Sequence, residues 1–248
     1  AWVKQVMREQ GSLLLAPTVT HLWFLLYLMC FFVLVWVVSA FELKRMPSWL
    51  ADVHPGVLVG VAPLLLVPAL ASVDAPFPAP EFFIPQLWAL VFFGFYFAVG
   101  YLLFHRESLL EPLRSWMPLL LVSALAAYAV FFKYLGTSQP SLSLRLLQAA
   151  LEAHAGLCMT LWCLQVGKDL LNGRNQMMRY LADASYWVYL VHLPLLFAIQ
   201  YHLLDVAAEW QMKLVLSVLA TSLLALASYQ LLVRHTLVGA LLNGRRPA

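Results

Sequence analysis

The sequence predicts an all-α fold, a polytopic integral membrane helix bundle with about seven transmembrane helices. Hydrophobic residues make up 63% of the chain and charged residues only 11%, whereas an ordinary soluble domain has roughly 25% charged residues. The mean hydropathy of the 248 residues is +0.82. The apolar residues also fall into long runs separated by short polar connections, and this pattern favours a membrane bundle over a soluble core.

Seven apolar segments are read as spans, because a helix needs roughly 20 mostly apolar residues to cross a hydrocarbon core of about 30 Å. In chain order they are residues 20–41, 56–73, 86–104, 116–135, 145–166, 184–204 and 212–233. The connections between them contain helix breakers, as in the proline-rich stretch at 74–85 and in "GTSQPSLS" at 136–143. Pro63 and Pro68 lie inside the second segment, so that helix is expected to be kinked. We expect the spans to form one membrane domain over residues 1–248.

Several other functions find no support in the sequence. Cys30, Cys158 and Cys163 all lie in apolar runs and have no metal-ligand spacing, so no metal site is predicted. The net charge of +3 gives no indication of a nucleic-acid partner. The expected partner of the long apolar surfaces is the lipid bilayer, whereas the sequence says nothing about oligomeric state.

The placement of lysine and arginine predicts the orientation. The connections after the first, third and fifth segments and the C-terminal tail hold ten of the fifteen basic residues: Lys44, Arg45, Arg106, Arg114, Lys168, Arg174, Arg179, Arg234, Arg245 and Arg246. The other side holds Lys4, Arg8, Lys133, Arg145 and Lys213. By the positive-inside rule the C-terminus is cytoplasmic and Ala1 begins outside. Because residues 1–10 do not resemble a signal peptide, we expect an odd number of upstream spans to be missing and the chain to be a C-terminal portion.

The sixth segment carries an unusual polar stripe. Ser185, Tyr189, His192 and Gln200 fall within an arc of about 80° on a helix, and His192 lies roughly 12 Å from the start of the span. Ionisable groups inside the membrane are functional candidates, so the stripe suggests a polar cavity. The alternative is that His192 only bonds a hydroxyl of a neighbouring helix, an interaction worth about 0.6 kcal/mol on average.

A second polar group lies in the fifth segment. Arg145, Gln148 and Glu152 lie at i, i+3 and i+7, within about 60° of one another. Glu152 leans toward Arg145, and Gln148 is placed to bridge them, so the group is either a structural pair or part of a site. His21 opens the first segment, where it is either an interfacial histidine beside Trp23 or a site residue.

Two stretches resemble a known family when they are taken together. "THLWFLLYL" (20–28) and "ASYWVYLVHLP" (184–194) resemble two signatures of the later half of the acyltransferase 3 family. Within that family they are most similar to the branch of glucans biosynthesis protein C. The segment "FFGFYFAVGYLLFHR" (92–106) is similar to a glycine-containing span of the family that ends in a basic turn.

The resemblance implies an integral O-acyltransferase of the bacterial inner membrane with about ten spans and both ends in the cytoplasm. It implies transfer of an acyl group, succinyl in this branch, from a cytoplasmic acyl-CoA to hydroxyls of a periplasmic glucan, with no bound cofactor. Removing three of ten spans leaves seven that begin outside and end inside, as the charges predict. The family's early half carries an Arg and a His, the usual candidate base, that have no counterpart here, and Leu193 replaces the second histidine of "HHP".

Acyl transfer to a hydroxyl requires a base and donors that stabilise the developing oxyanion. The resemblance suggests the first-span histidine as the base, and we expect His192 and Tyr189 to orient the acyl group or carbonyl in a shared cavity. Glu152 and Arg145 would shape the outer mouth of this cavity, and His21 would help to position the acceptor. The candidate catalytic residues are His192, Tyr189, Glu152 and Arg145, and the candidate substrate-binding residues are His21, Ser185 and Gln200. The alternatives are a transporter or flippase that moves a glycan or acyl carrier without chemistry, and a noncatalytic membrane scaffold.

Overall fold

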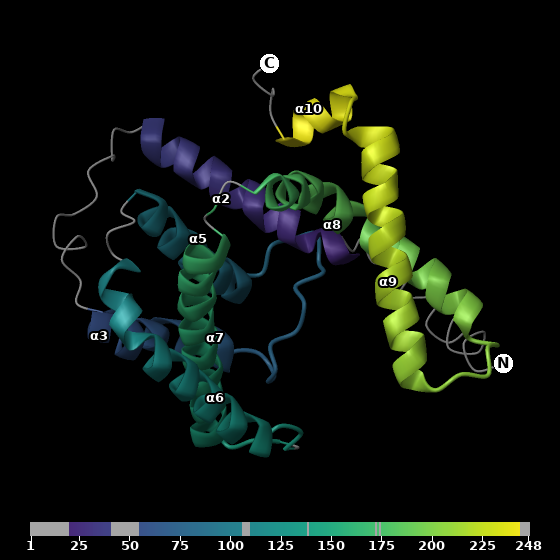
Figure 1. Ribbon diagram of the computed structural model, residues 1–248. Coiled ribbons are helices and arrows are strands. Elements are labelled where there is room, and N and C mark those ends of the chain that lie inside the picture. The colour runs from purple at the N-terminus through teal and green to yellow at the C-terminus, as the bar shows by residue number, and fades with distance from the viewer. Residues whose placement is uncertain are drawn as a thin grey trace. The chain divides into compact units, whose positions relative to one another are not determined.

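The computed structural model describes residues 20–40, 55–105, 110–137, 139–171, 173 and 175–243, and every regular element in these ranges is a helix (Figure 1). The all-α class is therefore confirmed. The chain divides into two compact units, Ala1–Leu170 and Leu171–Ala248. Several basic residues used to predict the orientation lie outside the described ranges: Lys4, Arg8, Lys44, Arg45, Arg106, Arg174, Arg245 and Arg246.

Five helices in the described ranges are long and apolar enough to cross a membrane, as a polytopic membrane protein requires. They are Thr20–Ala40, Leu87–Phe104, Pro112–Lys133, Gln176–Leu203 and Trp210–Val233. Each overlaps one of the seven segments expected from the sequence, although Gln176–Leu203 begins eight residues before the expected start at residue 184. The other two, residues 56–73 and 145–166, do not meet both conditions.

The 56–73 segment is broken into short helices because of its prolines. It consists of α3 (Pro55–Gly60), the 3-10 helix η4 (Ala62–Leu66) and α4 (Val67–Ala71). Pro63 and Pro68 lie in the first turns of η4 and α4, where proline's missing N–H is tolerated. The apolar run Gly56–Ala71 would extend only about 24 Å even as one continuous α-helix, which is short for a hydrocarbon core of about 30 Å. The expected kink is present, and it divides the segment.

The 145–166 segment lies within α7 (Leu142–Leu171), whose 30 residues give a length of about 45 Å. Its length is sufficient, but its polar residues make it less apolar than the other long helices. Gln148 and Gln165 are buried, so part of this polarity faces the protein interior. The polar residues of α7 therefore lower its mean hydropathy although two of them face the protein interior.

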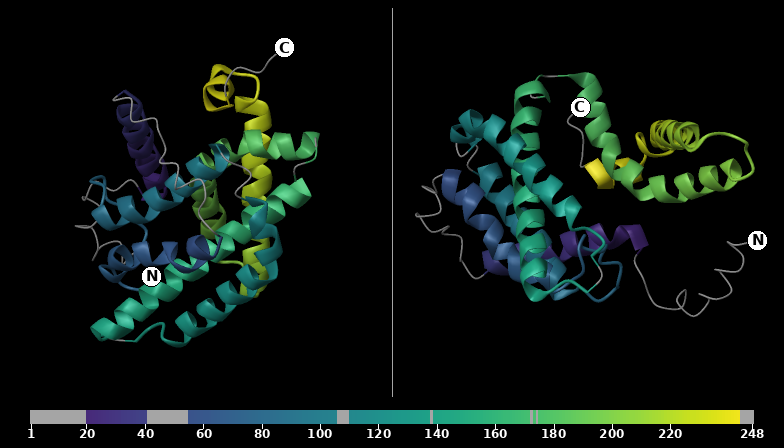
Figure 2. Two further views of the ribbon diagram at one scale, coloured as in Figure 1. Left: turned by 90° about the vertical axis from the view of Figure 1, so that its left-hand side faces the viewer. Right: turned by 90° about the horizontal axis from the view of Figure 1, so that it is seen from below.

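In the first unit α6 (Met117–Lys133) and α7 lie antiparallel and side by side (Figures 1 and 2). At one end, ion pairs join the 3-10 helix η6 (Pro112–Trp116) and the residue before it to the last turn of α7. These pairs are Arg114–Asp169 at 3.7 Å and Lys168–Glu111 at 3.6 Å. At the other end Gln148 Nε2 donates to the carbonyl of Tyr134, which follows α6. Connections that the sequence assigns to opposite sides of the membrane thus lie at opposite ends of this unit.

The helices α2 (Trp23–Ala40) and α5 (Leu87–His105) pack against each other in parallel. Trp23 contacts Phe93 with ring centroids 5.0 Å apart, and Phe31 contacts Phe97 at 5.2 Å. Both helices begin at the end of the unit that holds the start of α7, because Ala149 near that start is buried in the same apolar cluster as Tyr27 and Trp88. A second apolar cluster joins α3, α5, α6 and α7.

The second unit consists of α8 (Gln176–Leu203), α9 (Trp210–Ser228), the π-helical turn η7 (Tyr229–Val233) and α10 (Leu237–Asn243). The buried residues of α9 are small and spaced by four, Ser217, Thr221 and Ala225, a pattern that allows close helix packing. Trp187 Nε1 of α8 donates to Ser228 Oγ at 2.9 Å. These contacts make α8 and α9 a helical hairpin.

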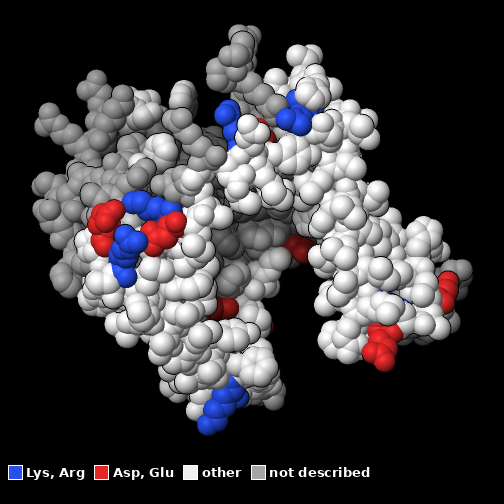
Figure 3. Space-filling view, viewed as in Figure 1, with Lys and Arg blue, Asp and Glu red and all other residues white. Residues whose placement is uncertain are grey.

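The outer surfaces are largely apolar, as expected for helices that face lipid. Exposed residues of α2 and α9 include Phe32, Trp36, Leu219 and Leu223. On the face seen in Figure 3 charged side chains are few and gather in small groups.

Candidate functional site

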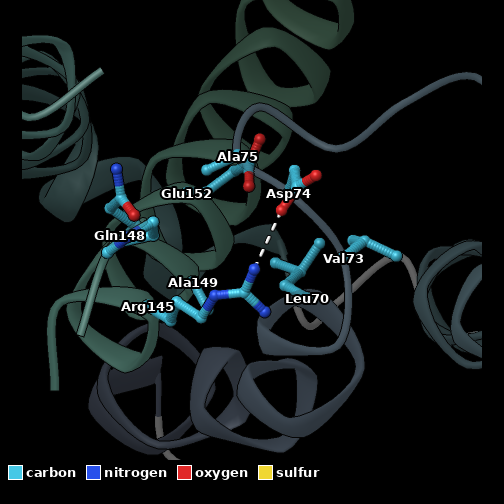
Figure 4. Close-up of a pocket in the computed structure, with 9 residues that line it drawn as sticks. Leu70, Val73, Asp74, Ala75, Arg145, Gln148, Ala149 and Glu152 are labelled. Atoms are coloured by element: carbon cyan, nitrogen blue, oxygen red, sulfur yellow. Dashed lines mark hydrogen bonds and ion pairs between the residues drawn. The ribbon is translucent and has the colours of Figure 1, made fainter. Parts of the chain in front are cut away.

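The first unit contains a small pocket between the start of α7 and the segment that follows α4 (Figure 4). Its lining residues are Leu70, Val73, Asp74, Ala75, Pro140, Arg145, Gln148, Ala149 and Glu152. The cavity volume is about 10 Å³, roughly what one water molecule needs. Two candidate site residues of the sequence analysis, Arg145 and Glu152, therefore line one pocket.

The charged contact of the pocket is an ion pair between α7 and the connection after α4. Arg145 Nη2 lies 2.9 Å from Asp74 Oδ1, drawn as the dashed line in Figure 4. The side chain of Asp74 is 89% exposed and that of Arg145 is 38% exposed. The pair is therefore a solvent-screened contact at the pocket mouth and not a buried charge pair.

The other polar lining residues of α7 also form hydrogen bonds with residues of other elements. Glu152 Oε1 accepts a hydrogen bond from the Phe77 N–H at 3.2 Å, and the Gln148 amide donates to Tyr134. These partners differ from the bridge along the helix expected from the sequence. Residues at i and i+7 are separated by about 10 Å along the helix axis, whereas the folded-back connection brings Asp74 and Phe77 directly against α7.

Aromatic packing connects this pocket to the segment of His21. The Phe77 ring lies 4.8 Å from Phe92 and 6.1 Å from Phe93, and Phe93 packs on Trp23, two residues after His21. Gln86, at the end of the proline-rich connection, donates its N–H to the Tyr27 hydroxyl at 2.8 Å. The start of α2 is thus at the same end of the unit as the pocket.

His192 lies in α8 of the second unit, with its ring half-buried. Its Nδ1 is 2.7 Å from the carbonyl oxygen of Tyr189, and the two rings are 5.8 Å apart. A carbonyl oxygen only accepts, so Nδ1 must donate. In the neutral ring Nε2 is then the unprotonated nitrogen, and it can accept a hydrogen bond or a proton.

The remaining stripe residues are more exposed than His192. Ser185 is exposed and donates to the carbonyl of Ala182 in its own helix at 2.7 Å, and Gln200 is exposed. Only Tyr189 and His192 of this stripe combine partial burial with a local contact. The two candidate groups are therefore an Arg–Asp–Glu pocket in the first unit and a Tyr–His pair in the second.

Comparison with known proteins adds the family. The acyltransferase 3 family model, described as an acyltransferase domain, matches residues 2–232 of the chain. The chain belongs to the acyltransferase 3 family. Comparison with curated proteins and with solved structures gave no match. Family membership, together with the five apolar helices, identifies a membrane acyltransferase in general terms.

Three partners in this acyltransferase 3 chain were missed by the sequence analysis: Asp74, Phe77 and Tyr134. One feature of the sequence could have pointed to Asp74 as the partner of Arg145. Asp74 is a carboxylate in a connection without lysine or arginine, and this connection is predicted on the same side of the membrane as Arg145. No feature of the sequence points to Phe77 and Tyr134, because they make their contacts through backbone atoms. Among the described residues no group of histidine, cysteine and acidic side chains is arranged to hold a metal ion.

Proposed function

We propose that this membrane acyltransferase is an O-acyltransferase that moves an acyl group, succinyl by preference, from a cytoplasmic acyl-CoA to hydroxyls of a periplasmic glucan. The family match over residues 2–232 supports acyl transfer as the general reaction. The similarity of "THLWFLLYL" and "ASYWVYLVHLP" to the glucan branch supports the donor and acceptor. The charge distribution supports an inner-membrane protein with a cytoplasmic C-terminus. In this orientation the end of the first unit with Asp74 and Arg145 is periplasmic.

The proposed reaction joins a sugar oxygen to the thioester carbonyl carbon and releases the CoA thiol. A hydroxyl is a weak nucleophile near neutral pH, so its proton must be accepted as the bond forms. With Nδ1 donating to the Tyr189 carbonyl, Nε2 is the acceptor nitrogen of an uncharged imidazole, and such an atom suits a hydroxyl and does not suit a carbonyl oxygen. We therefore assign His192 to holding the acceptor hydroxyl, in place of orienting the acyl group or carbonyl, the role that we expected from the sequence. By the resemblance, the base that finally accepts this proton is the histidine in the family's early half.

The test is His192→Ala in the full-length protein, expressed in cells that make the periplasmic glucan. The contact that positions the acceptor is lost, so succinylation should fall about 100-fold while the protein level in the membrane stays unchanged. Succinyl content is measured on the isolated glucan and protein level by immunoblot. His202→Ala is the matched control, because this exposed histidine lies at the end of the same helix.

Normal succinylation in the His192→Ala variant would exclude the proposed role. Movement of unmodified glycan by the wild-type protein, with no acyl product, would favour the transporter or flippase instead.

A further inference from the structure

We propose that Arg145 binds the free carboxylate of an acidic acyl group, and that Asp74 occupies this position when the ligand is absent. The assignment of the carboxylate to the acyl group rests on the proposed function. The carboxylate site itself rests on the pocket and on the contacts of its charged residues.

The residues that line the pocket include one cation and two carboxylates, so a small anion can bind only at Arg145, in the place that Asp74 takes. Arg145 is the only basic residue among them, and it lies in the first turn of α7, where the helix dipole also favours negative charge. Glu152 is the other acidic lining residue besides Asp74, and its Oε1 accepts the Phe77 N–H. A ligand carboxylate would therefore bind at the guanidinium and away from Glu152.

The apolar lining residues determine what the carboxylate can be attached to. Leu70, Val73, Pro140 and Ala149 offer no polar side-chain atoms, so they suit methylene groups next to the charge. The Asp74 side chain is itself a methylene group with a carboxylate, chemically the same as the free end of a succinyl group. The Asp74–Arg145 contact shows that a carboxylate on a methylene group can reach the guanidinium from the pocket mouth.

Exchange between Asp74 and a ligand is energetically easy. Exposed ion pairs are weak, so the paired state should be favoured over the open state by only about 1.5- to 5-fold. With Asp74 in place the cavity has room for about one water, so ligand binding and the Asp74 contact exclude each other. Removing the competitor should then increase the apparent affinity about two- to sixfold.

The first experiment measures binding by the full chain in nanodiscs, by calorimetry. The probes are monomethyl succinate, which has one free carboxylate, and dimethyl succinate, which has none. We expect saturable binding of the monoester alone, binding about two- to sixfold tighter in Asp74→Asn, and its loss in Arg145→Gln. Lys133→Gln is the control, because this lysine ends α6 near Tyr134 and does not line the pocket.

Two outcomes of the binding experiment would overturn the proposal. One is the absence of saturable monoester binding in both the wild-type protein and Asp74→Asn. The other is that Asp74→Asn and Arg145→Gln destabilise the protein equally and leave monoester binding unchanged. The ion pair would then serve only to hold the connection after α4 against α7.

The second experiment compares succinyl-CoA with acetyl-CoA as donors for the same glucan. Arg145→Gln should lower the ratio of succinyl to acetyl transfer, and Asp74→Asn should preserve or raise it. A ratio that Arg145→Gln leaves unchanged would refute the assignment to the acyl group. If the wild-type protein transfers neither group, the proposed function fails, while the binding experiment still decides the carboxylate site.

Discussion

At the scale of single residues, tight packing in the first unit depends on a glycine of α7. A β-carbon at Gly156 would lie 2.8 Å from the Tyr96 hydroxyl oxygen, whereas one at Gly167 in the same helix would meet nothing within 4 Å. The Gly156 carbonyl also accepts from the Thr160 hydroxyl at 2.7 Å. Gly156 is therefore a position of close approach, and Gly167 is an ordinary helical site.

We predict opposite effects for alanine at these two glycines. Gly167→Ala should stabilise the protein by about 0.5–1 kcal/mol, because alanine favours the helix. Gly156→Ala should lose this gain or destabilise the protein, because the Tyr96 ring must move. Thermal unfolding in detergent measures both variants. Equal stabilisation by the two would contradict the close contact.

At the scale of elements, the proline-rich connection after α4 is held on α7 and α2 by few contacts. Phe77 bonds Glu152, Asp74 pairs with Arg145, and Gln86 bonds Tyr27. The Phe77 ring adds apolar contacts with α5. The connection thus forms one wall of the pocket, and its position depends on a carboxylate that accepts a backbone N–H.

We predict that Glu152 holds the connection through its oxygen acceptor and not through its charge. Glu152→Gln keeps an oxygen for the Phe77 N–H, so it should change stability little, whereas Glu152→Ala should cost about 1 kcal/mol. Hydrogen exchange of the peptide that contains Phe77 should rise in the alanine variant only. A similar rise in both variants would show that the charge matters.

The same elements show how far sequence patterns reach. Long apolar runs predicted seven spans, and five of them are long apolar helices in the structure. Pro63 and Pro68 predicted a kink in residues 56–73, and the structure divides this segment there, because both effects follow from local chemistry. The pattern placed Arg145 and Glu152 on one face, but their partners come from a connection about 70 residues earlier in the chain, which helical periodicity does not encode. The orientation of the His192 ring also required the structure, because a hydrogen bond to a backbone carbonyl fixes it.

At the scale of the whole molecule, the first unit has two distinct ends. Asp74, Tyr134 and Arg145 lie at one, and Glu111, Arg114 and Lys168 lie at the other. A membrane protein must place such ends on opposite sides of the bilayer if the helices between them span it.

We predict that Thr137→Cys is labelled by an impermeant thiol reagent from the periplasm and Ser115→Cys only from the cytoplasm. Both positions are exposed and lie at opposite ends of α6. The three native cysteines are first replaced by alanine. Labelling of both sites from one side would contradict the two-ended arrangement, and exchanged sides would reverse the proposed orientation.

The π-helical turn η7 at the end of α9 has a consequence for changes in chain length. The Arg234 N–H bonds the Tyr229 carbonyl five residues earlier, so this turn holds one residue more than an α-helical turn. Each residue inserted in or deleted from a regular helix turns all later side chains by about 100°. A one-residue deletion among the exposed Leu231 and Leu232 would instead restore ordinary α-helical spacing, so the last span has a natural place to absorb such a change.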